Sequence, residues 1–251
     1  MKILICGYGF VGRAHELALE RDHEVYIYDP AKGHTLYAKP DAVIIAVSTP
    51  MDVDGSCNMT NVIDCISMIP SGTPILIKST ISLSGWDYIT RDYPHEDICF
   101  SPEFLRAEHA MEDFNNQKDI LIGGKGTNFW IAILSELLPN VKFITADARE
   151  LILAKYTRNS FLALKVAFFN QIHDLCDGTG VDYDSVVLAT GMDERIGYSH
   201  TQVTKERGFG GHCLPKDSSA LVEMGRPKKY TETVMTILEE AIKYNKRLTD
   251  G

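Results

Sequence analysis

Three glycines near the N-terminus constrain the fold of this chain more than any other feature. Gly7, Gly9 and Gly12 form a G-x-G-x-x-G loop between an apolar run at residues 2–6, which predicts a buried strand, and a helical stretch at residues 11–21. In such a loop the first glycine permits a tight turn, the second lets the backbone approach a pyrophosphate, and the third lets helix and strand pack closely. The loop therefore predicts the first turn of a Rossmann-type parallel sheet.

An acidic residue stands where such a loop is usually followed by one. Asp29 ends the second predicted strand, residues 24–28, about 20 residues after the glycines. A carboxylate there accepts hydrogen bonds from a ribose 2′-hydroxyl and repels a 2′-phosphate, so the pattern favours NAD over NADP. The alternative is a glycine turn and an aspartate that only begins a turn before Pro30. The residues expected to contact NAD from this pattern are Gly7, Tyr8, Gly9, Phe10, Val11, Gly12 and Asp29.

Strands and helices alternate through the first half of the chain. Further apolar runs predict strands at residues 42–47, 74–78, 98–101, 120–123 and 141–144, and helical periodicity predicts helices at residues 61–68 and 128–138. This alternation is typical of a parallel sheet with helices on both faces. We therefore expect an α/β fold whose first domain is of the Rossmann type.

The composition changes in the second half of the chain. Residues 146–177 contain neither proline nor glycine and are mostly apolar on all sides, so they predict one helix that ends before Gly178. About thirty residues of helix span roughly 45 Å, and such a helix must be buried in a helical domain or against a second subunit. We expect a NAD-binding domain at residues 1–146 and an all-helical domain for substrate binding and dimerisation at residues 147–251, closed by a helix at residues 228–247.

Charge, hydropathy and cysteine usage exclude several classes of protein. The chain has 25 basic and 34 acidic residues and a net charge of -9, which argues against nucleic-acid binding. No stretch is apolar enough to cross a membrane, and the apolar N-terminal run is too short for a signal peptide, so we expect a cytoplasmic protein without membrane partners. The six cysteines include no C-x-x-C pair, so we expect neither a metal site nor a disulfide framework.

Two polar residues interrupt the long apolar helix. Lys155 and Asn159 are four residues apart, so they share one face of the helix. A lysine in an apolar surface needs a partner or a ligand. A lysine whose ammonium group reaches solvent and an asparagine bonded to a neighbouring backbone would fit the pattern equally well.

The segment at residues 208–217 carries the strongest sign of chemistry. It reads Gly-Phe-Gly-Gly-His-Cys-Leu-Pro-Lys-Asp, and its three glycines let the backbone come close to a ligand. Asp217 could cap a short helix that runs to residue 224. Cys213 would then lie just ahead of a helix N-terminus with Lys216 nearby, and both features favour the thiolate form of a cysteine. The alternative is a capped turn with an inert cysteine.

This loop resembles the UDP-glucose/GDP-mannose dehydrogenase family, whose loop has the pattern G-[FY]-G-G-x-C-[FL]-P-K-D. Other segments resemble signatures of the same family in the same order, which makes the resemblance specific. They are V-x-T-P at residues 47–50, K-S-T at 78–80, S-P-E-F-L-R at 101–106, K-x-x-x-N-x-[FY]-L-A at 155–163 and D-x-R-I-G at 193–197.

The resemblance implies a double oxidation of a nucleotide sugar, with UDP-glucose converted to UDP-glucuronate as the expected case. Two hydrides pass in succession to two molecules of NAD. The first leaves an aldehyde, to which the thiolate of Cys213 adds to give a thiohemiacetal. Loss of the second hydride gives a thioester, and water then releases the acid.

The same resemblance implies a role for each polar residue of the motifs. Lys155 and Asn159 would stabilise oxyanions, while Asp217, Thr80 and Glu103 would orient water or act as the base. Thr49 and Thr80 would contact NAD. The implied catalytic residues are Cys213, Lys155, Asn159, Asp217, Glu103 and Thr80. The implied substrate contacts are Glu103, Phe104, Leu105, Arg106, Lys155, Asn159, Arg195, Phe209 and Gly210, with Arg195 reaching across a homodimer.

The chain departs from the family pattern in two ways that matter for function. Ala107 stands where the family usually has a glutamate, so we expect slow hydrolysis of the thioester. Family members continue beyond the position of Asn245 into a third domain that binds UDP. We expect a chain without that domain, in which Arg158, Lys205 and Arg207 could hold the nucleotide.

Two other functions stay open on the sequence. One is a non-catalytic subunit that binds NAD and a sugar nucleotide. The other is a single-step hydroxyacid dehydrogenase, which would need no cysteine nucleophile. A fold alone does not decide among these.

Overall fold

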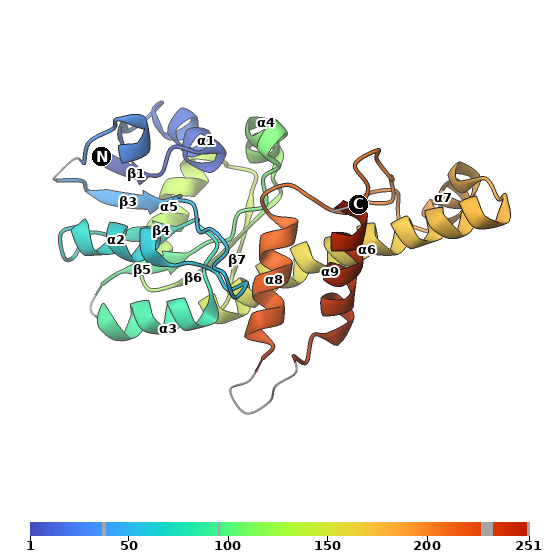
Figure 1. Ribbon diagram of the computed structural model, residues 1–251. Helices are drawn as coiled ribbons and strands as arrows, with labels where there is room; N and C mark the ends of the chain where they lie inside the picture. The colour runs from blue at the N-terminus through green and yellow to red at the C-terminus, as the bar shows by residue number, and fades with distance from the viewer. Residues whose placement is uncertain (37–38, 95, 227–232, 250–251) are drawn as a thin grey trace. The chain divides into compact units, whose positions relative to one another are not determined.

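The computed structural model describes residues 1–36, 39–94, 96–226 and 233–249 (Figure 1). These residues divide into two compact units. The first comprises residues 1–50 and 57–155, and the second comprises residues 51–56 and those from 156 onward. The predicted boundary between residues 146 and 147 lies just before the long helix α6 (Ala148–Thr179).

A seven-stranded sheet forms the centre of the first unit, and its strand order is β2-β1-β3-β4-β5-β6-β7. All seven strands were predicted, and their ends differ from the prediction by two residues at most. Ile3 of β1 pairs with Val25 of β2 on one side and Ala42 of β3 on the other, all in parallel. The strands are β1 (Lys2–Cys6), β2 (Glu24–Tyr28), β3 (Ala42–Ile45), β4 (Ile75–Ile77), β5 (Ile98–Phe100), β6 (Asp119–Gly124) and β7 (Lys142–Thr145).

One pairing departs from the expected parallel sheet. β6 runs antiparallel to β5, with Cys99 opposite Gly124, while β7 is parallel to β6. The connection from β5 to β6 contains only the short helix α4 (Ala110–Asn116) besides a single turn of 3-10 helix. A helix of that length spans about 10 Å, so it does not carry the chain back along the sheet. β6 therefore starts beyond the carboxyl end of β5 and returns.

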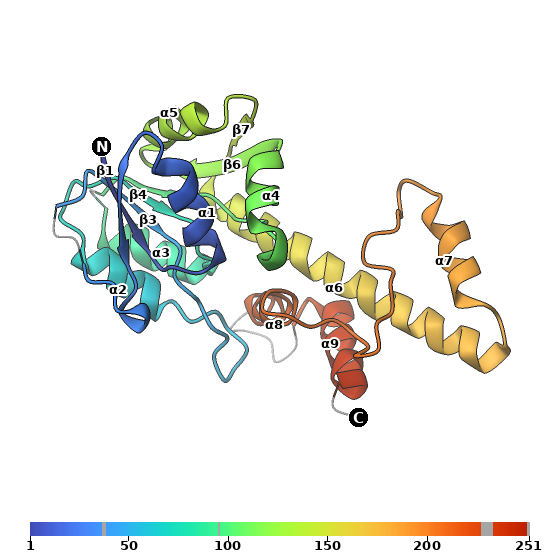
Figure 2. The ribbon, with the colours of Figure 1, turned by 90° about the horizontal axis from the view of Figure 1, so that it is seen from above.

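Helices cover both faces of this sheet, as expected (Figure 2). On one face, alternate strand residues such as Ile3, Ile44 and Leu76 pack in one core with Phe114 of α4 and Trp130 of α5. The other face is covered by α2 and α3. The sequence predicted α2 but not α3. The remaining helices of this unit are α1 (Phe10–Leu19), α2 (Thr60–Met68), α3 (Leu83–Asp92) and α5 (Thr127–Leu137).

The second unit is helical in its described part. It holds most of α6, α7 (Tyr183–Gly191), α8 (Leu214–Met224) and α9 (Thr236–Thr249). Among the described residues, no helix is long and apolar enough to cross a membrane.

Two helix ends in this unit correct the prediction. α6 continues through Gly178 and ends at Thr179, because Gly180, with φ +73°, supplies the left-handed conformation that closes a helix. The last helix begins at Thr236 rather than at residue 228. Residues 228–232 lie outside the described part of the chain, and residues 233–235 precede the helix.

Candidate active site

The three glycines of the N-terminal loop have three different environments. Gly7 has φ +95°, and its N–H donates to Tyr28 O at 2.8 Å. A Cβ on Gly12 would lie 2.1 Å from Gly7 O, so only glycine lets α1 pack this closely on the loop. Gly9 is the N-cap residue of α1, and a Cβ on it would meet nothing within 4 Å. No neighbour within the chain requires glycine at position 9, and the open space fits the approach of a pyrophosphate to the N-terminus of α1.

A pocket with a volume of about 290 Å³ lies beside this loop. Asp29, at the end of β2, lines it, and Asp29 Oδ2 accepts a hydrogen bond from Tyr8 N at 2.9 Å. The size is at the lower end for ligand pockets, which suits the adenosine half of a dinucleotide. The residues that line the pocket are Gly7, Tyr28, Asp29, Pro30, Ala31, Val47, Ser48, Asn61, Asp64, Cys65 and Met68. Those of α2 were not predicted, because no motif marks them.

Three predicted residues follow three neighbouring parallel strands. Thr49 comes after β3, Thr80 after β4 and Glu103 after β5. Because carboxyl ends of parallel strands meet at one edge of a sheet, the fold brings these residues to the edge where α/β proteins bind ligands. Ser79 Oγ donates to Val47 O at 2.7 Å and so ties two of these loops together.

Two buried lysines converge on the loop after β5. Lys78 Nζ lies 3.2 Å from Glu103 Oε2 and donates to Ser101 Oγ at 2.9 Å. Lys155 Nζ donates to the backbone oxygen of Glu103 and lies 4.9 Å from the centre of the Phe104 ring. Lys155 therefore does not reach solvent, and its exposed fraction is 7%. The predicted Lys155, Glu103 and Phe104 form one cluster in the first unit.

The charges of this cluster set the ionisation of Glu103. Burial raises the pKa of Glu103, but the charge of Lys78, the nearby His15 and the hydrogen bond from Phe104 N together hold that pKa below its usual range. His15 is fully buried on α1, and burial, followed by the charge of Lys78, lowers its pKa to about 4. Glu103 is thus an anion and His15 a neutral imidazole at neutral pH.

Lys78 and His15 were not predicted as members of the site. Lys78 is the first residue of the K-S-T segment, so its position was noted without a role. A lysine directly after an apolar strand is a usable signal, because a buried ammonium group needs a partner. His15 gives no such signal. Its ring nitrogen Nδ1 lies 3.0 Å from Val11 O of its own helix, so a local partner explains the histidine without any site.

Cys213 differs from the other five cysteines, because it is exposed and they are buried. It is the residue before α8, so its side chain lies at the N-terminal end of that helix, as predicted. The unpaired N–H groups of a helix N-terminus stabilise a negative charge, which a thiolate carries.

Asp217 does not cap a helix, which corrects one of its two predicted roles. α8 begins three residues earlier, at Leu214, and Asp217 is fully buried inside its first turn. Asn159 Nδ2 donates to Asp217 Oδ2 at 2.6 Å, and Lys216 Nζ lies 2.7 Å from Asp217 Oδ1. The predicted Asn159 and Asp217 are therefore direct partners, although 58 residues separate them in the sequence.

The glycine loop that precedes Cys213 has a buried base and an open tip. The ring of Phe209 packs with Ala163 and Ala167, so this predicted substrate contact is a core residue. A Cβ on Gly210 or Gly211 would meet nothing within 4 Å. The open backbone at these two glycines is the part of the loop that a ligand can approach closely.

Three arginines that were candidates for substrate binding have partners within the chain. Arg106 forms an ion pair with Asp113, at 2.6 Å, and Arg195 forms one with Asp193, at 2.5 Å. Arg195 stays exposed over 88% of its side chain, as a residue that reaches another subunit would be. The guanidinium group of Arg207 bonds to residues of α6 and is not free to hold a nucleotide.

Leu105 is half-buried, and Ala107 begins a 3-10 turn, Ala107–His109, in which Glu108 is exposed. The turn therefore supplies no buried carboxylate beside Glu103. Among the described residues, no group of three or more histidine, cysteine, aspartate or glutamate side chains could hold a metal ion.

The fold and these clusters define a two-unit α/β protein with a dinucleotide site in a Rossmann-type unit and an exposed thiol in a helical unit. The chain belongs to the UDP-glucose/GDP-mannose dehydrogenase family. Residues 31–141 match the NAD binding domain of that family, and residues 149–247 match its central domain. The first unit is therefore an NAD-binding domain.

Curated relatives are similar to this chain over most of its length. A UDP-glucose 6-dehydrogenase of Rhizobium meliloti is 33% identical over 226 residues, which cover 81% of this chain and 51% of the relative. A UDP-glucose 6-dehydrogenase of Bacillus subtilis is 31% identical over 221 residues, which cover 83% of this chain and 49% of the relative. The chain thus spans about half the length of the curated relatives it matches.

Solved structures share the fold. A UDP-glucose dehydrogenase from Pyrobaculum islandicum has a TM-score of 0.81 and 25% identity, over 98% of this chain and 68% of that one. A 3-hydroxyisobutyrate dehydrogenase from Mycobacterium tuberculosis has a TM-score of 0.70 and 16% identity, over 99% of this chain and 94% of that one. The second likeness concerns the fold alone.

Proposed function

We propose that this protein is an NAD-dependent nucleotide-sugar 6-dehydrogenase that oxidises UDP-glucose to UDP-glucuronate. The observation that carries the proposal is the exposed thiol of Cys213 at the N-terminus of α8, at the end of an open glycine loop. A one-step dehydrogenase has no use for such a thiol. The names of the curated relatives point to the same substrate.

NAD, when bound, accepts the hydride in each of the two oxidations. The N-terminal glycine loop would hold its pyrophosphate, with Gly9 as the place of closest approach. Asp29 would accept hydrogen bonds from the adenosine ribose, which favours NAD over NADP. Thr49 and Thr80, at the carboxyl ends of β3 and β4, would contact the rest of the cofactor.

Cys213 would act after the first oxidation. Its thiolate sulfur bonds to the carbon of the aldehyde, and the carbonyl oxygen becomes the oxyanion of a thiohemiacetal. Departure of a hydride from that carbon leaves a thioester on Cys213. Water then adds to the thioester carbonyl, the carbon–sulfur bond breaks, and the acid and the free thiolate separate. The sulfur begins and ends the sequence in the same state.

The polar residues on α6 would stabilise the oxyanions. Asn159 is held by Asp217, which in turn is close to Lys216, so its amide is fixed in orientation. Lys155 is fixed in the same way by the backbone oxygen of Glu103. Preorganised donors of this kind stabilise a developing negative charge without reorganising during the reaction. Asp217 and Glu103 are anions that could orient the hydrolytic water or accept its proton.

Other predicted residues would hold the sugar nucleotide. The segment from Glu103 to Arg106 follows β5 at the ligand-binding edge of the sheet. Gly210 offers open backbone in the cysteine loop. Arg195, which is exposed, would reach the substrate of a second copy of the chain.

The exposed face of α6 supports a homodimer. Phe161, Phe168 and Leu175 follow one another at intervals of seven residues, and each exposes more than half of its side chain. Leu188 and Met192, in and after α7, add further exposed apolar surface, and α7 lies beside the C-terminal part of α6 in both ribbon views (Figures 1 and 2). A seven-residue apolar repeat is typical of helices that pair, and such a surface favours association over solvent.

Replacement of the thiol tests the proposal. We expect Cys213→Ala to form no UDP-glucuronate while its affinity for NAD, measured by calorimetry, equals that of the wild type. Cys176→Ala, which changes a buried cysteine of the same unit, is the matched control and should retain turnover. Wild-type rates of acid formation in Cys213→Ala would remove this residue from the reaction.

A further inference from the structure

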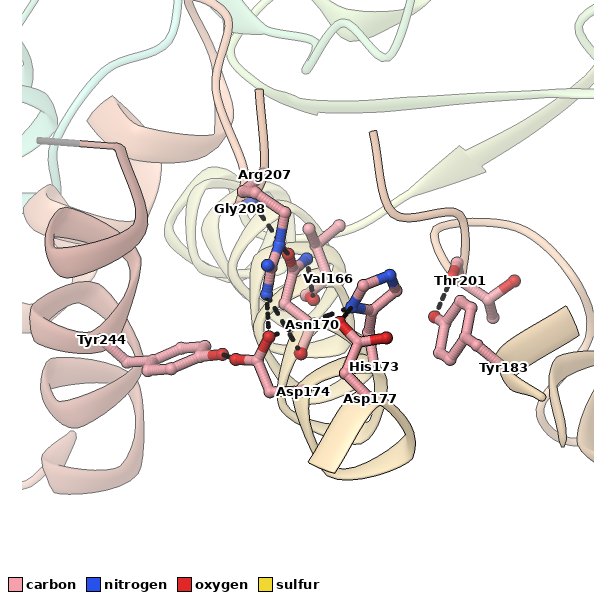
Figure 3. A network of polar contacts seen from close by, with 10 residues as sticks. All are labelled: Val166, Asn170, His173, Asp174, Asp177, Tyr183, Thr201, Arg207, Gly208 and Tyr244. Atoms are coloured by element: carbon pink, nitrogen blue, oxygen red, sulfur yellow. Dashed lines mark hydrogen bonds and ion pairs between the residues drawn. The ribbon is translucent and has the colours of Figure 1, made fainter. Parts of the chain in front are cut away.

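The base of the cysteine loop is fixed by a network of side chains from α6 and α9 (Figure 3). Asn170 Oδ1, on α6, accepts hydrogen bonds from Gly208 N at 3.1 Å and from Arg207 Nε at 2.9 Å. The guanidinium group of Arg207 also forms an ion pair with Asp174, one turn further along α6. Tyr244 OH, from α9, donates to the other oxygen of Asp174 at 2.8 Å. Three elements therefore meet at one arginine and one carboxylate.

A second contact from α9 fixes the next residue of the loop. Asn245 Oδ1 accepts from Phe209 N at 2.6 Å, and Asn245 Nδ2 donates to Phe209 O at 2.9 Å. The amide of Asn245 thus satisfies both backbone groups of one buried residue. The three residues from Arg207 to Phe209 are thus held by three side chains, those of Asn170, Asp174 and Asn245, and Tyr244 in turn holds Asp174.

The backbone at the base of the cysteine loop has an unfavourable conformation, which the network stabilises. Arg207 has φ +56° and Gly208 has φ +62°, so both lie in the left-handed region. A residue with a Cβ pays about 1–2 kcal/mol for that conformation. It persists where the surroundings over-determine it, and such positions cluster at functional sites. Arg207 is one of two non-glycine residues with positive φ in the described part of the chain.

Beyond the base, the loop is open until α8 begins. Gly210 and Gly211 have no neighbour near the place of a Cβ, and Cys213 is the residue before α8. Glycines restrain their neighbours weakly because they allow many backbone conformations. The arrangement of the open tip is therefore set by its two ends, which are the network at residues 207–209 and the first turn of α8.

We propose that Arg207 is a positioning residue, which acts through Asp174 and Asn170 to hold the cysteine loop in the one arrangement that presents its open glycines and Cys213 to the substrate. This inference rests on the proposed function, since it assigns the loop to substrate binding. The sequence made Arg207 a candidate contact of the nucleotide, but its bonds to α6 give it an internal role.

The test compares Arg207→Leu with Arg207→Lys and with a matched control, Arg226→Leu. Arg226 follows the other end of α8 and forms ion pairs with Glu223 and with Glu239 of α9, so its loss removes comparable contacts far along the helix from Cys213. The readouts are kcat and KM for UDP-glucose, the KM for NAD, and the rate at which iodoacetamide alkylates Cys213 without ligands.

We expect Arg207→Leu to raise the KM for UDP-glucose by about tenfold, because loss of preorganisation weakens binding of a ligand that needs the loop. The rate of Cys213 alkylation should change several-fold, because the loop that leads to Cys213 is no longer held at its base. Arg207→Lys should recover part of both effects, the KM for NAD should stay within about twofold, and Arg226→Leu should show neither effect.

The proposal would be overturned if Arg207→Leu had the same KM for UDP-glucose and the same rate of Cys213 alkylation as the wild type. It would also be overturned if Arg226→Leu changed both values as much as Arg207→Leu does. If Arg207→Leu does not fold, Tyr244→Phe removes one hydrogen bond of the same network and should shift both readouts in the same direction by less. The alkylation comparison needs no turnover. It therefore tests the network even if the wild type does not oxidise UDP-glucose, a result that would defeat the proposed function alone.

Discussion

At the scale of single residues, Glu103 is the centre of the charged cluster in the first unit. Its carboxylate neutralises Lys78, and its backbone oxygen accepts from Lys155. Removing a charge from water is unfavourable, but the loss is larger when one partner of a buried pair is deleted and the other is left alone. The net attraction of the Lys78–Glu103 pair therefore adds little to stability, whereas deleting either partner leaves the other charge buried and unpaired, which costs much more.

Glu103→Gln tests this balance. The substitution leaves the Lys78 ammonium buried without a counter-charge, and we expect a loss of about 3 kcal/mol in the free energy of unfolding. Asp113→Asn is the control, because it breaks an ion pair whose arginine is exposed and should lose less than about 1 kcal/mol. The depressed pKa of Glu103 adds stability above its unfolded value, which is lost as pH falls through the folded pKa. Urea unfolding of wild type and variant should therefore converge in acid, and a constant difference at every pH would contradict this account.

His15 makes a second prediction, about pH. Its pKa of about 4 in the folded protein lies below the ordinary value of 6.5, first because of burial and then because of Lys78. Between these two pH values the unfolded chain binds a proton that the folded protein does not, so acidification over that range removes about 3 kcal/mol of stability. His15→Gln cannot take up this proton, so its unfolding free energy should change less between pH 7 and pH 4. Parallel curves for the two proteins would show that another group is responsible.

At the scale of elements, the long helix α6 makes a prediction about assembly. Phe168 lies in the middle of its exposed apolar stripe. We expect Phe168→Glu to shift the protein from dimer to monomer in analytical ultracentrifugation, because a carboxylate in a paired apolar surface would be buried without a partner. Ile237→Glu changes an exposed apolar residue of α9 that lies outside the stripe and should leave the mass unchanged. A monomeric wild type would contradict the dimer.

The elements that sequence predicts well are those with a strong local signal. The seven strands were found because each contains a short run of apolar residues with few polar interruptions. α3, α4 and α7 were missed. Each spans ten residues or fewer, and glycine, serine or aspartate interrupts its apolar positions, so the sequence offers only a short stretch over which a helical period could be recognised. The antiparallel direction of β6 depends on how the chain returns after β5, and no local pattern encodes it.

The candidate site divides in the same way. The glycine loop, Asp29 and Cys213 were predicted from local motifs. In the structure Asp29 lines the pocket beside the glycine loop, and Cys213 is exposed ahead of α8, while their roles stay predictions. The partners of these residues are distant in sequence, as Asn159 and Asp217 are, and only folding brings them together. This is why Asp217 was also interpreted as a cap, since its local context alone fits that role.

At the scale of the whole molecule, each of the two units carries its own group of candidate site residues. The NAD-binding unit holds the dinucleotide pocket and the cluster around Glu103, and the helical unit holds Cys213 with Asn159 and Asp217. α6 contributes to both, because Lys155 belongs to the first unit and Asn159 to the second. The proposed double oxidation requires both the bound NAD and the nucleophilic sulfur, whereas a single oxidation would require no such sulfur.

The most direct test of this account is to mix the purified protein with excess NAD and a limiting amount of UDP-glucose and count the NADH formed. The account predicts two molecules of NADH and one of UDP-glucuronate for each sugar consumed. One NADH per sugar with an accumulating aldehyde, or no NADH from a protein that binds NAD normally, would contradict it.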